Sequence, residues 1–172
     1  LAGGADLERQ LIAQCPCALL LVRTSVWSQP LRLLAAVDPG HPFDKPAALD
    51  QSIVSTGAVL ASRLGGELSL LHVIEALEPD ALAAAVHHGQ REWVFRLAGE
   101  VHVPGKRVHV FSGAAASEIA RWAHESDADV LLMGSIARTA SAAPRLGNTV
   151  ARVLDQVRCD VLALRLSPLQ SA

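Results

Sequence analysis

Short apolar runs that alternate with longer stretches of helical periodicity are the feature that most constrains this chain. From Leu31 onward each run has the length of a strand, and a helical pattern separates it from the next run. This alternation indicates consecutive strand–helix–strand units, whose crossovers produce a parallel sheet covered by helices. The strands are predicted at residues 31–38, 67–74, 106–111, 129–134 and 160–166.

The helices follow from the spacing of apolar residues between these runs. Apolar positions recur at three- and four-residue intervals from Asp50 to Leu64, and the pair Gly65 and Gly66 then supplies a helix stop. Three further helices are predicted at residues 78–99, 117–127 and 147–156. The expected fold class is therefore α/β, with a doubly wound sheet of five parallel strands.

Composition limits both the core and the partners of such a domain. Hydrophobic residues make up 51% of the 172 residues but aromatic residues only 3%, so Leu, Val, Ile and Ala must fill the core. The net charge of −2 argues against nucleic acid and membrane surfaces as partners. The three cysteines have no metal-type spacing and the front of the chain shows no secretory signal pattern, so we expect free thiols and a cytoplasmic location.

The front of the chain contains a helix and a strand that have no crossover to the strand at residue 31. Residues 11–23 match residues 153–165 without gaps at an offset of 142, and the shared Gln, Cys and Arg argue against chance similarity between Leu-rich strands. An offset of about one domain indicates a repeat. We interpret residues 1–24 as the closing helix and strand of a preceding repeat, residues 25–30 as a linker, and residues 31–168 as the domain itself.

The same repeat predicts how the front segment packs. Two copies of one edge strand can satisfy each other's open backbone groups around an approximate two-fold axis. We therefore expect residues 17–23 to pair antiparallel with residues 160–166, with Leu20 opposite Leu162 or within two residues of it. The pairing can be intramolecular, as a pseudo-dimer, or exchanged between the chains of a homodimer.

A ligand site in an open parallel sheet lies beyond the carboxyl ends of the strands, where the winding reverses direction. The first strand ends at Val37 and Asp38, and the fourth ends at Gly134 before a loop rich in small residues. The next helix begins near Gly147, Asn148 and Thr149, where free backbone amides and the helix dipole favour an anion. Phosphate binding and an ordinary loop with Asn148 as the helix cap are equally compatible with these residues.

On these residues the chain resembles the universal stress protein family. Gly134 and Gly147 correspond to the first and last glycines of a motif found in that family. The motif consists of Gly, two residues, Gly, nine residues, Gly and then Ser or Thr. Further anchors are Asp38, the segment 71–73, and the closing strand that begins at Cys159 and Asp160. The chain is most similar to the tandem E type, which carries two domains and a Gly-Asn-Thr sequence at the last helix.

The resemblance implies an adenine-nucleotide alpha hydrolase-like fold with strand order 3-2-1-4-5 and a binding and assembly role in a stress response, without enzymatic activity. It implies that Asp38 and the Val73 backbone would meet adenine and ribose. Phosphates would lie against Gly134, Gly147, Asn148 and Thr149. Ala137 replaces the second motif glycine, and a methyl group there obstructs a phosphate, so ATP is expected to bind weakly. The alternative is a module without nucleotide that binds an apolar metabolite or a protein partner.

Other chemistry is less well supported by the sequence. Adjacent His87 and His88 diverge on a helix, and no further ligand falls at a metal-type spacing, so no metal site is expected. Cys15 and Cys17 lack the two-residue spacer of a thiol redox motif, and the position of Cys17 at a strand entry predicts its burial. No nucleophile elbow is present, and His72 is interpreted as a strand-end residue near the cleft rather than as a catalyst.

Overall fold

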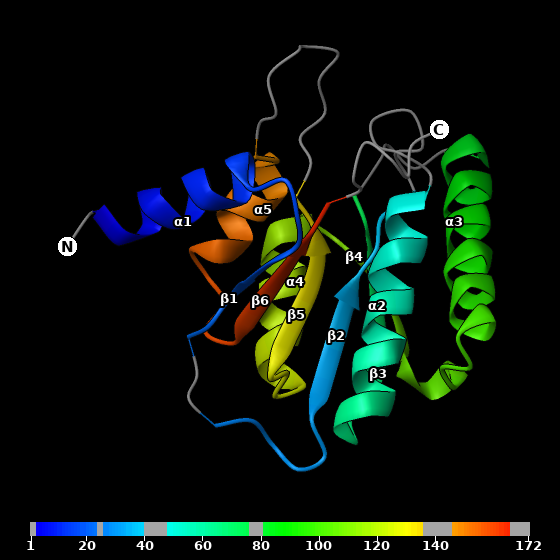
Figure 1. Ribbon diagram of the computed structural model, residues 1–172. Coiled ribbons are helices and arrows are strands. Elements are labelled where there is room, and N and C mark those ends of the chain that lie inside the picture. The colour runs from blue at the N-terminus through cyan, green and yellow to red at the C-terminus, as the bar shows by residue number, and fades with distance from the viewer. Residues whose placement is uncertain (1–2, 24–25, 40–47, 76–80, 136–145, 166–172) are drawn as a thin grey trace.

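The computed structural model describes residues 3–23, 26–39, 48–75, 81–135 and 146–165, which form one α/β domain around a single sheet (Figure 1). The order of the strands in the sheet is β1-β6-β5-β2-β3-β4, with β1 antiparallel to β6 and the other neighbours parallel. The predicted α/β fold class is confirmed, and the order of the five parallel strands is the one expected. The strands are β1 (Leu19–Leu21), β2 (Arg32–Ala36), β3 (Glu67–Ile74), β4 (Val108–Ser112), β5 (Val130–Gly134) and β6 (Asp160–Leu164).

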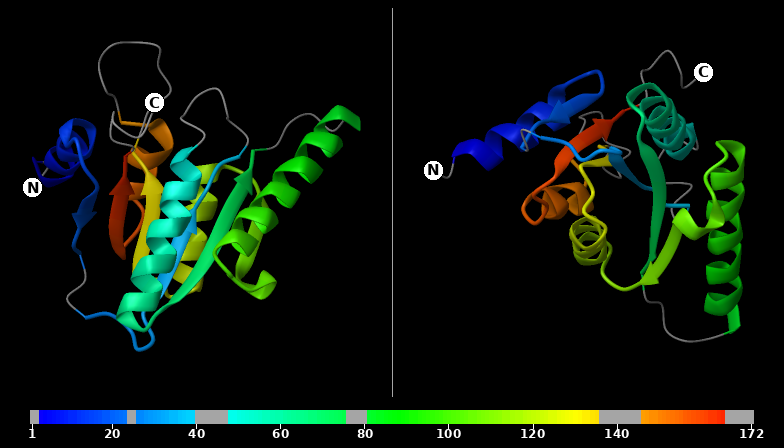
Figure 2. Two further views of the ribbon diagram at one scale, coloured as in Figure 1. Left: turned by 45° about the vertical axis from the view of Figure 1, so that its right-hand side comes forward. Right: turned by 90° about the horizontal axis from the view of Figure 1, so that it is seen from below.

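Helices cover both faces of the sheet, as the views in Figure 2 show. Along β2, Leu33 and Ala35 point into a core formed with α2 (Ala48–Leu64) and α3 (Ala81–Glu100). Leu34, between them, points into a second core with α4 (Ala115–Glu125) and α5 (Asn148–Leu154). This alternation places a buried layer of aliphatic side chains on each side of the sheet. Among the described residues, no helix is both long enough and apolar enough to cross a membrane.

Several boundaries differ from the sequence-based prediction for identifiable reasons. The strand β2 ends at Ala36 instead of residue 38, because Pro39 has no N–H with which to continue the ladder. The strand β4 begins at Val108 because the preceding residues Gly105–Arg107 form a 3-10 turn. The helix α4 ends two residues earlier than predicted, before Asp127, whose φ of 47° is incompatible with a helix. Residues 78–80 of the predicted helix 78–99 lie outside the described residues.

The front segment packs on the closing strand within the same chain. The strand β1 is shorter than the predicted 17–23, but it pairs antiparallel with β6, and Leu20 lies opposite Leu162. The flanking pairs are Leu19 with Ala163 and Leu21 with Val161. At the repeat offset of 142 residues Leu20 is therefore opposite its own counterpart, which is the pairing expected at a two-fold axis.

Two arginines that correspond in the repeat extend this symmetry. Arg23 Nη1 donates to the carbonyls of Leu154, the last residue of α5, and Val157, which follows the helix, at 2.9 and 2.8 Å. Arg165 Nη1 donates to the carbonyls of Ala13 and Cys15, at 3.2 and 3.4 Å, at the end of α1 (Gly3–Gln14). The arginine that follows each of the two strands, β1 and β6, thus binds the carboxyl end of the helix that belongs to the other copy of the repeat. Carbonyl groups at the carboxyl end of a helix have no partner within the helix.

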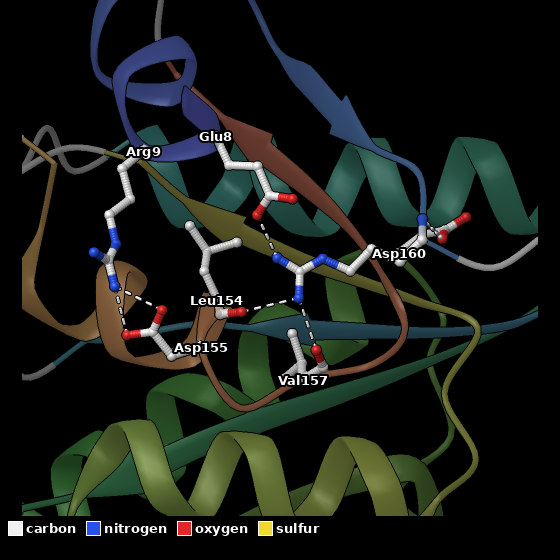
Figure 3. Close-up of polar contacts among 7 residues, drawn as sticks. Glu8, Arg9, Leu154, Asp155, Val157 and Asp160 are labelled. Carbon is white, nitrogen blue, oxygen red and sulfur yellow. Dashed lines mark hydrogen bonds and ion pairs between the residues drawn. The ribbon is translucent and has the colours of Figure 1, made fainter. Parts of the chain in front are cut away.

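Ionic contacts fix the same interface from the side of α1. Arg23 Nη2 lies 2.6 Å from Glu8, and Arg9 contacts Asp155, the C-cap residue of α5 (Figure 3). The described residues of the predicted linker are also held in place. Trp27 Nε1 donates to the buried carboxylate of Asp160 at 2.8 Å, and the amide of Ser28 donates to Asp129.

Candidate functional site

The winding of the sheet reverses between β2 and β5, which are parallel neighbours in its centre. After β2 the chain passes to α2 on one face, and after β5 it passes to α5 on the other (Figure 1). The connections therefore diverge at the carboxyl ends of these two strands, which is where ligands bind in doubly wound sheets. Asp38, Val73 and Gly134 all lie at this end of the sheet.

Asp38 follows β2 and is half-buried beside a second carboxylate from α2. Its backbone amide donates to Oδ1 of Asp50 over 3.2 Å, and Asp50 is 3% exposed. This contact ties the turn after β2 to the first turn of α2. Asp50 belongs to the predicted crossover helix, but helical spacing alone gave no signal that its carboxylate would support the site.

His72 lies beneath this turn on β3 and is 1% exposed. Its Nδ1 lies 3.1 Å from the carbonyl of Val37, to which it donates in the neutral Nδ1–H tautomer. Burial lowers the pKa of His72, and this effect outweighs the opposing influence of the Val37 carbonyl and of the nearby side chains of Asp38, Gln90 and Asp50. His72 is thus a buried residue near the end of β3 that supports the turn after β2, and its position near the strand end is the one expected from the sequence.

The backbone of Val73 reaches beyond the last pair of the β2–β3 ladder. That ladder ends with Ala36 opposite Leu71, and the Val37 amide donates to the Leu71 carbonyl over 2.9 Å. Because backbone groups alternate in direction along a strand, Val73 turns its N–H and C=O toward the same side as Leu71. Pro39, the residue that would donate next to Val73, has no N–H. The end of β3 therefore presents a backbone edge that β2 does not continue.

Gly134 permits close approach of α2 to the end of β5. A Cβ atom at this position would lie 2.7 Å from Cδ2 of Leu49 and 3.7 Å from Cδ1 of Ile53. A side chain at this position would therefore require the Leu49 side chain to shift, so helix packing alone favours glycine here. The next residue, Ser135, is buried, and both its amide and its hydroxyl donate to the Leu164 carbonyl.

The predicted side-chain cap of the last helix is wrong. Gly147 is the N-cap of α5 with an extended backbone, no side-chain cap hydrogen bond forms, and Asn148 is the first helical residue and is exposed. Asn148 cannot act as the cap because it already has helical backbone angles. Thr149 follows in the first turn and is half-buried. Ala137, on which the expectation of weak ATP binding depends, lies outside the described residues.

The structure thus brings Asp38, Val73 and Gly134 to one end of the sheet, together with Asp50 and His72. Gly147, Asn148 and Thr149 lie at the amino end of α5, which follows the same strand end. No group of three or more His, Cys, Asp or Glu residues that could hold a metal ion occurs in the part of the chain that the structure describes. The predicted burial of Cys17 is also wrong: its side chain is exposed, because β1 begins only at Leu19.

The reversal of winding in a parallel sheet that helices cover on both faces defines an α/β domain of the doubly wound class. The model of the universal stress protein family matches residues 31–165, and the chain belongs to that family. It is 26% identical to the universal stress protein E homolog of Haemophilus influenzae over 173 aligned residues, which cover 94% of this chain and 56% of that protein. The chain therefore spans about half the length of this relative.

Solved structures agree with this assignment. A putative universal stress protein from Pseudomonas aeruginosa has a TM-score of 0.77 and 28% identity, over 91% of this chain and 55% of that one. A universal stress protein from Archaeoglobus fulgidus, solved in complex with dAMP, has a TM-score of 0.58 and 15% identity, over 78% of this chain and 98% of that one. The likeness to the second protein concerns the fold alone.

Proposed function

We propose that this domain is a stress-response binding module that takes an adenine nucleotide weakly at the carboxyl ends of β2, β3 and β5. The observation that carries the proposal is the open backbone edge at Val73, which lies beyond the last ladder pair and beside a proline that has no N–H. An N–H and a C=O held side by side can pair with the donor and acceptor of an adenine edge. The dAMP complex of the Archaeoglobus fulgidus protein supports the choice of ligand class.

In this arrangement we assign the contact with the ribose to the carboxylate of Asp38. Its amide is held by Asp50, so the carboxylate projects from a fixed turn at the end of β2, where it can accept hydrogen bonds from sugar hydroxyls. The phosphates would then extend toward Gly134 and the first residues of α5, Gly147, Asn148 and Thr149. Ala137 is expected to crowd them. The proposal assigns binding rather than catalysis to these residues, and nucleotide turnover by the purified chain would overturn that part of it.

Calorimetric titration with ATP and magnesium tests the proposal. The unmodified chain should bind with a dissociation constant well above the micromolar range, Asp38→Asn should weaken binding, and Ala137→Gly should tighten it. Arg9→Ala, a change on the surface of α1, is the matched control and should leave affinity unchanged. Sub-micromolar binding by the unmodified chain would contradict the role of Ala137. If ATP does not bind at millimolar concentration, the alternative of an apolar metabolite or a protein partner replaces the proposal.

The assembly part of the proposal concerns residues 1–24, which we assign to the closing helix and strand of a preceding repeat. The reciprocal contacts of Arg23 and Arg165, and the pairing of Leu20 with Leu162, support it. The edge of β6 is then covered within the chain, as an intramolecular pseudo-dimer. Light scattering should find a monomer at micromolar concentration. A dimer that persists on dilution would favour exchange of the front segment between two chains.

A further inference from the structure

Two exposed or half-exposed thiols meet at the turn that joins α1 to β1. The Sγ atoms of Cys15 and Cys17 lie 3.4 Å apart, with Pro16 between the two residues, and both thiols are free. The motif has one intervening residue, so the spacing of a common redox pair is absent from the sequence. Even so, the turn brings the two sulfur atoms within reach of each other.

Both ends of this turn are held by contacts elsewhere in the fold. The Cys15 amide donates to the Leu11 carbonyl over 2.8 Å, and the Cys15 carbonyl accepts from Arg165. On the other side, Leu19 is paired with Ala163 in the sheet. Pro16 adds a fixed φ angle between the two cysteines. The sulfur atoms are therefore brought together by the docking of α1 and β1, and they must approach from 3.4 Å to about 2.0 Å for a disulfide bond to form.

The two thiols are not equivalent. The pKa of Cys15 is lowered, first by the backbone N–H and the thiol of Cys17 and also by the positive charge of Arg165. The pKa of Cys17 is raised, mainly by its hydrogen bond to Cys15 and by the charge on that sulfur. Cys159, the third cysteine, is buried, and burial raises its pKa. Cys15 is thus the thiol that ionises first, and Cys17 is the neighbour that can respond to it.

We infer that Cys15 and Cys17 form a thiol–disulfide exchange site that reacts with low-molecular-weight disulfides. The Cys15 thiolate attacks one sulfur of the small disulfide, which forms a mixed disulfide and releases one small thiolate. Cys17, after losing its proton to solvent, attacks Cys15 Sγ, which forms the Cys15–Cys17 bond and releases the second thiolate. Two protein thiols are oxidised and one small disulfide is reduced to two thiols, so atoms and electrons balance.

The site belongs to the first copy of the repeat alone. At the offset of 142 residues Cys17 corresponds to Cys159, but Cys15 corresponds to Val157, which has no sulfur. Val157 and Cys159 are both buried in the core that β6 and α5 share. The second copy therefore offers one buried thiol where the first offers an accessible pair. Cys159 is a built-in control for thiol reactivity in the folded chain.

The experiment treats the full chain with excess oxidised glutathione, stops exchange with acid and maps the products by mass spectrometry. The unmodified chain should lose two of its three thiols and gain an intramolecular Cys15–Cys17 bond, with Cys159 still reduced. Cys17→Ser should accumulate as a stable glutathione adduct at Cys15, since no second thiol can release it. Cys159→Ser should behave like the unmodified chain.

Three results would overturn the inference. One is retention of all three thiols under excess oxidised glutathione in the folded chain. Another is glutathione adducts that stay on both Cys15 and Cys17 without an intramolecular bond. The third is equal alkylation rates of Cys15, Cys17 and Cys159 in native buffer, since the structure predicts that Cys15 reacts fastest and that Cys159 reacts only after unfolding.

Discussion

Replacing Arg23 with alanine should destabilise the chain far more than its position near the front of the sequence indicates. The side chain binds the carbonyls of Leu154 and Val157 and the carboxylate of Glu8, and it is 21% exposed (Figure 3). Two hydrogen bonds from a charged donor contribute about 1.5 kcal/mol each at the low end of their range. The ion pair with Glu8, which is 34% exposed, adds less than about 1 kcal/mol.

The expected loss in the free energy of unfolding is therefore about 3 kcal/mol, or about 6–12 °C in Tm for a domain of this size. Urea denaturation of Arg23→Ala measures it, with the slope compared to detect any change in the denatured state. Arg9→Ala is the matched control, because its pair with Asp155 is 37% and 48% exposed and should contribute less than about 1 kcal/mol. Equal losses in the two variants would refute the assignment of Arg23 as the anchor of the front segment.

Three further changes test local features of the fold by thermal and urea denaturation. Gly66→Ala should lower the free energy of unfolding by more than about 2 kcal/mol, because the new Cβ would lie 2.6 Å from the Leu31 carbonyl oxygen. Gly65→Ala should lower it by about 1 kcal/mol, because Gly65 has a φ of 65° but lies in open space. A larger loss for Gly65→Ala than for Gly66→Ala would contradict the packing at this turn. Asn148→Ala should change the free energy of unfolding by less than about 0.5 kcal/mol, since the N-cap is Gly147. A loss near about 1 kcal/mol would instead show that the Asn148 side chain caps the helix. Burial holds the pKa of His72 in the folded chain below 6.5, so the unfolded chain binds the proton more tightly and the free energy of unfolding should fall as the pH drops below about 6.5. His72→Gln should reduce that fall. An unchanged pH dependence in the variant would rule out His72 as its origin.

Much of the architecture was predictable because burial on two faces leaves a clear trace in the sequence. Apolar runs of strand length and stretches with helical spacing identified each strand and each α-helix that the structure describes, but not the 3-10 turn at Gly105–Arg107, part of which was assigned to a strand. The repeat at 142 residues predicted the contact between Leu20 and Leu162, since identical edge strands satisfy each other symmetrically. The reciprocal arginine contacts were not predicted, although Arg23 and Arg165 match in the alignment, because no local pattern shows where a long side chain ends.

The errors concern places where a single backbone angle or the length of a strand decides the outcome. Asn148 has a residue type that favours the N-cap, but Gly147 occupies that position, Asn148 is the first helical residue, and no side-chain cap hydrogen bond forms. Cys17 was expected to be buried as part of a strand, yet the strand begins at Leu19. The carboxylate of Asp50 supports the turn at Asp38 through a contact between two elements, which no linear pattern contains.

The most direct test of the proposed site is a titration of the isotopically labelled chain with ATP, followed by the shifts of its backbone amide signals in NMR spectra. Weak binding in fast exchange suits this measurement, because the shifts report position at millimolar ligand even when affinity is low. The account predicts the largest saturable shifts at Val73 and Asp38, with smaller shifts at Gly134, Gly147 and Thr149. Saturable shifts confined to other parts of the chain, or none at all, would contradict the assignment of the nucleotide to the carboxyl ends of β2, β3 and β5.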